Sequence, residues 1–175
     1  LDVIVTDHHT VPAQLPEAVA VLNPKRSDAN YPFAELAGVA VAFKLVQALD
    51  IERKDVVMPV VKEYLALVTL GVIADIVPLR DENRLIAKEG LKQLEKLSKE
   101  QPGLFALAEV AGCTDTEIST GHVGYGLAPR INACGRLGKP ELGVNLLLSS
   151  NYEVAQKLAQ ELDDLNDRRQ DMSRE

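Results

Sequence analysis

Two short apolar runs near the start of the chain predict β-strands. The first covers residues 1–6 and the second covers residues 19–22, with a proline-bounded connection at 11–17 between them. A continuous Val-Ile-Val run is typical of a strand that is buried on both faces, as in a parallel sheet. The polar loop at 27–33 then closes the strand region.

Apolar residues at helical spacing dominate the remainder of the chain. Between residues 83 and 99 they recur on one face of a helix, and the other positions are mostly charged. The helices predicted from such spacing cover residues 35–49, 56–70, 83–99, 104–111, 141–148 and 152–175. We therefore expect an α/β fold in which helices flank a parallel sheet, followed by a long helix from residue 152.

Composition fits one compact core and narrows the function. The 175 residues are 46% hydrophobic, which is enough to fill a domain interior. Aromatic residues make up only 4%, which argues against a base-stacking platform in this chain. The net charge of −7 predicts weak binding of nucleic acid by the chain alone, although basic residues cluster at 130–139.

Cysteine usage and hydropathy indicate a cytoplasmic location. Cys113 and Cys134 do not form a Cys-x-x-Cys pair, so neither a zinc site nor a redox pair is predicted. Free thiols suit a reducing compartment. No apolar run is long enough to suggest a membrane span, and we expect no membrane partner.

Asp7, His8 and His9 directly follow the first predicted strand. Residues just past the carboxyl end of a strand line the ligand crevice of open α/β sheets. A neutral imidazole can bind a divalent metal, and a neighbouring carboxylate can fix its tautomer. The triplet therefore predicts a metal or phosphate site, with a polar surface turn as the alternative.

Asp75 is a carboxylate in an apolar segment, residues 64–79. A charged group in such surroundings is expensive to desolvate, so it should be paired, hydrogen-bonded or bound to a cation. The alternative is that Asp75 caps a following helix.

Residues 126–139 place glycines between Arg130, Asn132, Arg136 and Lys139. Glycine lets a backbone approach a ligand closely, and arginine matches phosphate oxygens with two parallel donors. We predict a phosphate-contacting loop. A mobile interdomain loop with solvated charges is the alternative.

Together these stretches resemble one family, the DHH phosphoesterases, and among them the single-strand-specific exonucleases. The residues that carry the resemblance lie at 3–9, 22–24, 36–43, 70–79 and 128–137. The first range marks the superfamily, and the later ranges indicate the exonuclease branch.

The resemblance implies phosphodiester hydrolysis assisted by two divalent cations, Mn²⁺ or Mg²⁺. By motif matching, His8 and Asp75 would be metal ligands. His9 would contact the scissile phosphate or protonate a leaving group, and Asp7 would orient an imidazole. In the third segment, the resemblance implies that Arg130, Asn132 and Arg136 contact the DNA backbone. His122 receives no catalytic role.

The first two Asp-bearing motifs of the family are missing from these residues, so we expect an internal piece of a longer protein. Residues 1–150 would form the C-terminal part of the DHH catalytic domain, and residues 151–175 would begin a linker helix toward a DHH-associated domain. With the metal site incomplete, we expect this piece to be inactive by itself.

The resemblance further implies 5′-to-3′ degradation of single-stranded DNA in recombination and repair, alongside a helicase and a single-strand-binding protein. Two other hypotheses stay open. One is a DHH phosphoesterase that acts on short oligonucleotides or cyclic dinucleotides, and the other is a non-catalytic module that binds nucleic acid or protein. A helicase is disfavoured because no Gly-x-x-x-x-Gly-Lys-Ser/Thr loop is present.

Overall fold

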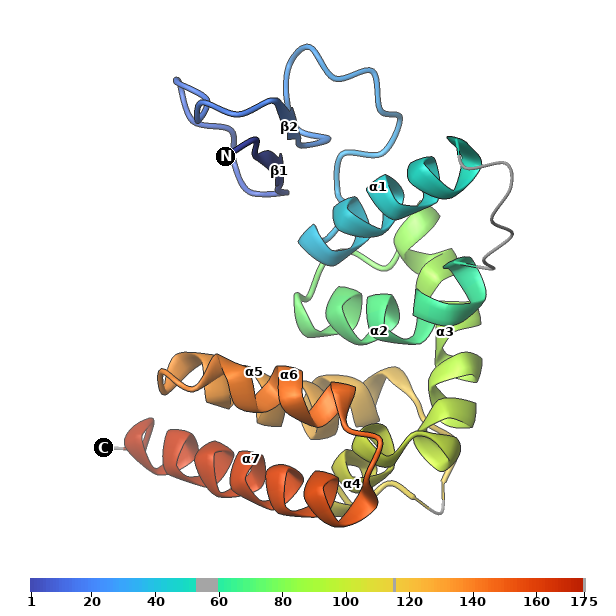
Figure 1. Cartoon of the computed structure of the whole chain (residues 1–175), viewed down its shortest axis with the longest axis vertical. Coiled ribbons are helices and arrows are strands. Elements are labelled where there is room, and N and C mark those ends of the chain that lie inside the picture. Colours follow the sequence, from blue (N-terminus) through green and yellow to red (C-terminus); the bar gives the residue numbers. More distant parts are fainter. Residues whose placement is uncertain (53–59, 115, 175) are drawn as a thin grey trace. The chain divides into compact units, whose positions relative to one another are not determined.

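A two-stranded parallel sheet and a set of helices make up the computed structural model (Figure 1), which describes residues 1–52, 60–114 and 116–174. β1 (Ile4–Thr6) pairs with β2 (Ala20–Leu22), and Val5 lies opposite Val21. The predicted α/β class and parallel pairing are confirmed. Both strands are shorter than the apolar runs that predicted them.

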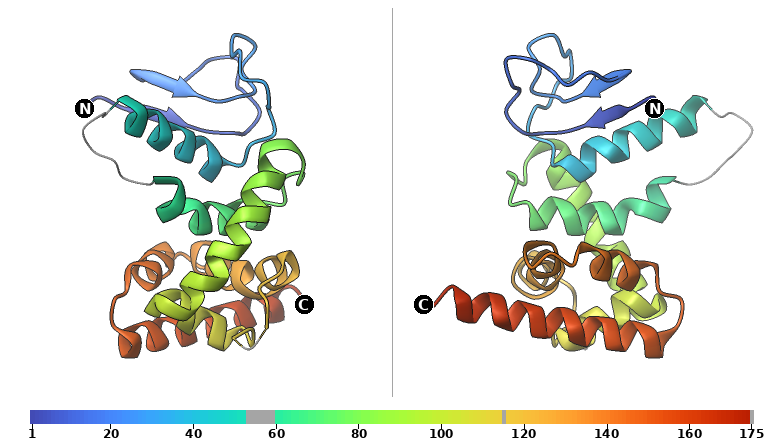
Figure 2. Two further views of the ribbon diagram at one scale, coloured as in Figure 1. Left: turned by 90° about the vertical axis from the view of Figure 1, so that its right-hand side faces the viewer. Right: turned by 60° about the vertical axis from the view of Figure 1, so that its left-hand side comes forward.

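The chain divides into two compact units, residues Leu1–Gly90 and Leu91–Glu175. The first unit contains the sheet, α1 (Gly38–Glu52), α2 (Val60–Ala74) and the start of α3 (Asp81–Glu100). In both views of Figure 2 the two strands lie side by side with α1 next to them. The predicted helix over 56–70 begins at Val60 in the structure, and residues 56–59 lie outside the described part.

The core of the first unit lies between α1 and α2. Gly71 makes their close approach possible, because a β-carbon there would lie 2.7 Å from Cγ1 of Val39. α3 joins this core through Ile86, whose carbonyl accepts a hydrogen bond from the buried Thr69 hydroxyl at 2.9 Å. The buried core residues are Phe33, Leu36, Ala37, Ala40, Val41, Phe43, Leu65, Val68, Val72 and Ile86.

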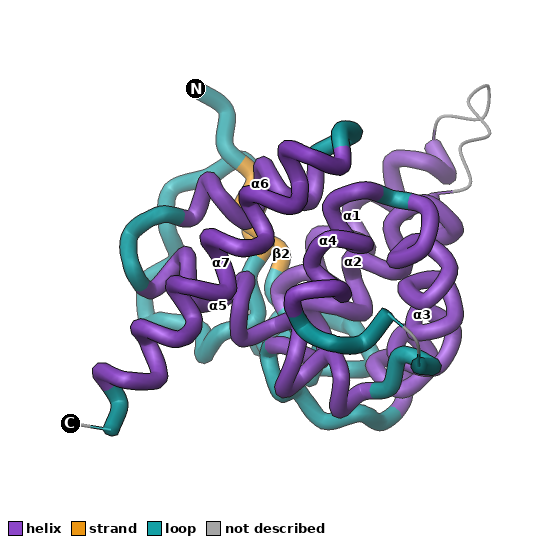
Figure 3. Tube along the Cα trace, turned by 90° about the horizontal axis from the view of Figure 1, so that it is seen from below, coloured by secondary structure: helices purple, strands orange, loops and turns teal. Residues whose placement is uncertain are grey.

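The second unit is helical throughout its regular structure, as the tube in Figure 3 shows for the described residues. After α3 come α4 (Pro102–Val110), a π-helix η1 (His122–Leu127), α5 (Ala128–Arg136), α6 (Pro140–Leu148) and α7 (Tyr152–Met172). α7 starts at a side-chain cap, since Asn151 Oδ1 accepts the Val154 N–H at 3.0 Å. Its apolar stripe is buried against α4, α5 and α6.

One predicted feature differs from the structure. The predicted loop over 126–139 is mostly helix, because η1 continues into α5 and Pro129 lies in the first turn, where its missing N–H costs no hydrogen bond. The compact units divide after Gly90, and α7 packs within the second unit. The proposal that residues 151–175 lead to a further domain stays a prediction.

None of the described helices combines the length and apolar character that crossing a membrane requires.

Candidate functional site

His8 and Asp75, the two residues predicted to be metal ligands, lie close together in the first unit. His8 follows β1, and Asp75 follows the last residue of α2. The imidazole Nε2 of His8 lies 3.3 Å from Oδ2 of Asp75, and the two side chains are 16% and 41% exposed. An imidazole nitrogen and a carboxylate oxygen thus face each other at an accessible edge of the fold.

The first residue of α1 holds the His8 ring in place. A β-carbon at Gly38 would lie 3.2 Å from Cδ2 of His8, which is tighter than ordinary van der Waals contact. Glycine therefore lets the N-terminus of α1 lie directly against the imidazole. This contact and the approach of Asp75 to Nε2 restrict the position of the His8 side chain.

Asp7 organises the turn that carries both histidines. Its Oδ1 accepts the backbone N–H of His8 at 2.8 Å and that of His9 at 3.2 Å, and it lies 2.7 Å from Nδ1 of His9. The hydrogen bond with the His9 side chain, helped by the backbone donors, lowers the pKa of Asp7 to about 2. Asp7 is therefore ionised at neutral pH, and its Oδ1 accepts a hydrogen bond from the protonated Nδ1 of His9.

This arrangement defines what His9 can do. When Nδ1 carries the proton, the lone pair of a neutral imidazole is on Nε2. The His9 side chain is 78% exposed, so this second nitrogen is accessible to a ligand. Asp7 therefore contacts the imidazole of His9 through Nδ1, and its predicted role in orienting an imidazole stays a prediction.

Asn23 is a site residue to which the sequence analysis assigned no role. It follows β2 and is 7% exposed. Its Nδ2 donates to the carbonyl of His9 at 3.0 Å, and its Oδ1 accepts the N–H of Lys25 at 2.9 Å. Polar residues just past the carboxyl end of a strand line a crevice, which is why the triplet was singled out. The same rule applies to Asn23.

The three residues of the predicted phosphate loop lie in the second unit, on α5, and they differ in exposure. Asn132 and Arg136 are exposed and lie four residues apart, on one face of the helix. Arg130 is mostly buried, with its side chain 16% exposed. Asn132 and Arg136 thus lie together on an exposed face of α5, whereas the side chain of Arg130 is mostly buried.

Arg130 makes its contacts within the protein. Its Nη1 and Nη2 donate to the carbonyls of Gly126 at 2.8 Å and Val110 at 3.0 Å. Its Nε lies 2.7 Å from Oδ1 of Asp163, which makes an ion pair although the two atoms are not aligned as a hydrogen bond. This geometry differs from the expected DNA-backbone contact and supports a role in joining α5 to α7.

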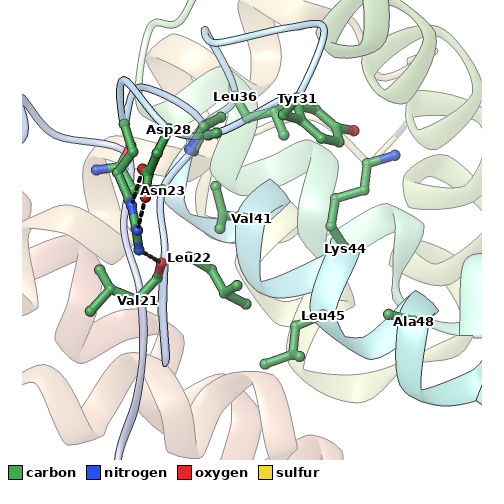
Figure 4. A pocket seen from close by; sticks show the side chains of 13 residues that line it. Val21, Leu22, Asn23, Asp28, Tyr31, Leu36, Val41, Lys44, Leu45 and Ala48 are labelled. Carbon is green, nitrogen blue, oxygen red and sulfur yellow. Dashed lines mark hydrogen bonds and ion pairs between the residues drawn. The ribbon is translucent and has the colours of Figure 1, made fainter. Parts of the chain in front are cut away.

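A pocket of about 460 Å³ lies in the first unit, and its lining does not include the His8–Asp75 pair. Figure 4 shows Val21 and Leu22 from β2 on one side of it and Leu45 and Ala48 from α1 on the other. Two cationic side chains line it, and both are already paired, Lys44 with Glu82 at 2.6 Å and Arg26 with Asp28 at 2.6 Å. The pocket thus offers mainly apolar walls, and we assign it no part in the chemistry.

Among the residues that the structure describes, no group of three or more His, Cys, Asp or Glu side chains is arranged to hold a metal ion. His8 and Asp75 are therefore a pair of potential ligands and not a complete metal centre.

Comparison with known proteins gives one consistent result. Residues 1–72 match the DHH family, N-terminal domain. The chain is 46% identical over 172 residues to the single-stranded-DNA-specific exonuclease RecJ of Bacillus subtilis, an alignment that covers 98% of this chain and 21% of that protein. It is 41% identical over 180 residues to RecJ of Escherichia coli, with 98% and 31% covered.

Solved structures agree with the sequence comparison. The crystal structure of RecJ in complex with Mn²⁺ from Thermus thermophilus superposes with a TM-score of 0.81 at 38% identity, covering 97% of this chain and 24% of that one. A structure of exonuclease RecJ bound to manganese gives 0.80 at 39% identity, covering 97% and 41%. This chain thus spans about a fifth to a third of the length of the curated relatives it matches.

Proposed function

Because the chain belongs to the DHH family, we propose that it forms part of the catalytic region of a RecJ-type exonuclease that hydrolyses single-stranded DNA in the 5′-to-3′ direction. The observation that carries the proposal is the approach of His8 Nε2 to Asp75 Oδ2 at 3.3 Å. These residues come from two separate motifs, and the fold brings them to one point at the end of β1.

His8 and Asp75 fit a divalent cation. Two donor atoms that each lie about 2.0–2.2 Å from one metal are roughly 3 Å apart, close to the separation observed here. A mixed imidazole and carboxylate donor set suits manganese, and the solved RecJ structures contain Mn²⁺ or Mg²⁺. Such cations stabilise the charge that develops on the attacking and leaving oxygens of a phosphodiester.

A two-metal site needs more ligands than His8 and Asp75 provide. We propose that the remaining carboxylates come from parts of the full-length relatives that this chain does not span. The 175-residue chain should accordingly bind Mn²⁺ weakly and hydrolyse no DNA at a measurable rate. Robust metal-dependent cleavage by this chain alone would contradict the proposal.

We propose that His9 contacts the phosphate or transfers a proton, and that Asp7 orients His9. Asp7 fixes the imidazole through Nδ1. When both ring nitrogens of His9 carry protons, its Nε2–H would contact the scissile phosphate or pass that proton to the leaving oxygen, and the ring would return to the neutral form. Asn23 holds the backbone of His9 while this happens. The role of these residues is thus to orient one imidazole toward the substrate.

Asn132 and Arg136 are the proposed contacts to the DNA backbone, because both are exposed and lie on one face of α5. Arg130 supports this face from within the protein. We further propose that the full-length enzyme acts in the cytoplasm, in recombination and repair, together with a helicase and a single-strand-binding protein.

Steady-state kinetics of the full-length protein test the proposal. The substrate is a 5′-labelled single-stranded oligonucleotide, with its duplex as a control, in the presence of Mn²⁺. His8→Ala and Asp75→Asn should each reduce kcat at least about a hundredfold, as expected for removal of a metal ligand. Asp2→Asn, at an exposed carboxylate before β1, is the matched control and should leave kcat unchanged. Wild-type rates in both ligand variants would contradict the proposal.

A further inference from the structure

The backbone of Ile76 adopts a left-handed conformation, with φ of 56°, and its side chain is 88% exposed. Left-handed geometry is costly for an L-residue with a branched β-carbon, by about 1–2 kcal/mol. Burial of an apolar side chain normally offsets such a cost, but here the side chain faces solvent. Neither backbone preference nor packing within the described structure accounts for an isoleucine at this position.

Hydrogen bonds and packing on both sides impose this conformation. α2 ends at Ala74, and the N–H of Ile76 then bonds the Ile73 carbonyl at 3.2 Å. After Ile76 the chain is held again, because Val77 packs against the core and the Pro78 carbonyl accepts a hydrogen bond from Asn83 Nδ2 at 3.0 Å. A left-handed residue just past a helix end is the place where glycine is usual.

The position of Ile76 explains why a side chain would be retained there. Ile76 directly follows Asp75, whose carboxylate faces the imidazole of His8. An exposed, branched apolar side chain therefore lies one residue along the chain from the carboxylate that would hold metal. An apolar surface at this place suits the sugar or base of the nucleotide whose phosphate is cleaved.

We propose that Ile76 is a substrate contact, and that its side chain packs against the sugar or base next to the scissile phosphate of single-stranded nucleic acid. This inference rests on the function proposed above. An apolar contact of this kind does not depend on which base is present, since every base has an apolar face. Ile76 thus contributes to affinity for the strand without selecting a sequence.

The test uses the full-length protein and three variants. Ile76→Gly removes the side chain and the backbone strain together, and Ile76→Val keeps a branched apolar group. Ile51→Ala, near the C-terminal end of α1 and 74% exposed in the wild type, controls for the loss of an exposed isoleucine elsewhere. The measurements are Tm, KM and kcat on a single-stranded oligonucleotide with Mn²⁺.

Ile76→Gly should raise KM about five- to tenfold, the effect of losing roughly half of the full burial of one branched side chain, while Tm is unchanged or higher. Ile76→Val and Ile51→Ala should stay within about twofold of wild type. A wild-type KM for Ile76→Gly would overturn the inference. A lower Tm with unchanged KM would also overturn it, because the side chain would then pack against another part of the protein.

A fall in kcat alone would likewise overturn the inference, since Ile76 would then only position Asp75. Failure of the proposed function is a separate result, because in that case the wild-type enzyme itself would not degrade single-stranded DNA.

Discussion

The guanidinium Nε of Arg130 lies 2.7 Å from Oδ1 of Asp163, and the side chains are 16% and 23% exposed. The pair joins α5 to α7, and the remaining donors of Arg130 serve two backbone carbonyls. Arg136, six residues later on α5, has its side chain exposed. One short helix thus carries an arginine that stabilises the second unit and another that is accessible to a ligand.

Arg130→Ala should destabilise the protein, because Asp163 and two carbonyls would lose their partner while mostly buried. A loss of about 1–3 kcal/mol is expected for a pair that retains some solvent contact. Chemical denaturation of the full-length protein measures it. Arg130→Lys should recover only part of the loss, since a compact ammonium cannot pair with Asp163 and also donate to both carbonyls as the planar guanidinium does. A stable Arg130→Ala protein that binds DNA weakly would show instead that Arg130 contacts DNA.

Arg136→Ala should weaken DNA binding without changing stability. Loss of one phosphate contact lowers the slope of log Kd against log salt concentration by about 0.7 for a single strand. Fluorescence anisotropy with a labelled single strand, measured over a series of salt concentrations, gives this slope. Arg84→Ala, at an exposed arginine on α3, is the control and should keep the wild-type slope. An unaltered slope for Arg136→Ala would exclude the proposed contact.

Asn23→Asp tests whether the backbone of His9 must be held. The substitution keeps an oxygen that accepts from Lys25 N and removes the donor to the His9 carbonyl. We expect kcat to fall about tenfold with little change in KM, because His9 is displaced and strand binding is not. Asn23→Ala should show the same loss of kcat and a lower Tm. If Asn23→Asp retains full activity, the hydrogen bond to His9 has only a structural role.

Glu82 makes the stability of the first unit dependent on pH. Partial burial alone would raise the pKa of Glu82, but hydrogen bonds from Lys44 and Tyr31 outweigh it and lower the pKa below its ordinary value. A carboxyl group with a lowered pKa in the folded state stabilises the fold above its unfolded pKa, and this contribution disappears as the pH falls through the folded pKa.

Glu82→Gln should therefore lower Tm slightly at pH 7, by the equivalent of at most about 1 kcal/mol for a pair that is one-third exposed. The difference from wild type should shrink as the pH falls below about 4.5. Thermal unfolding of both proteins between pH 7 and pH 3 checks this. A difference that stays constant over that range would rule out the ion pair as its cause.

The sequence predicted the regular elements well where local patterns determine them. The run Val3-Ile4-Val5 predicted a strand, and β1 is present there, but the predicted burial on both faces is wrong, because Val3 is 47% and Ile4 52% exposed. α3 and α7 follow from apolar residues at helical spacing. The segment around Gly126 and Gly135 was predicted wrongly as a loop. Packing of buried residues such as Cys134 makes it helical, and local propensity does not reveal such packing.

The residue types of the candidate site could be predicted from the sequence, but their spatial arrangement could not. The triplet and Asp75 were singled out by their chemistry, and the resemblance to a family suggested that His8 and Asp75 act together. The support from Gly38 and Asn23 depends on a close approach and on a hydrogen bond to a backbone carbonyl. Neither depends on sequence spacing, so only the fold reveals them. The same holds for the left-handed backbone of Ile76.

The central claim is that His8 and Asp75 bind the same divalent cation. Crystals of the full-length protein grown with Mn²⁺ allow the metal to be located by its anomalous scattering. The account predicts a peak within about 2.0–2.4 Å of both His8 Nε2 and Asp75 Oδ2, which disappears in Asp75→Asn crystals. Manganese peaks that lie only elsewhere, with His8 and Asp75 still paired directly, would contradict it.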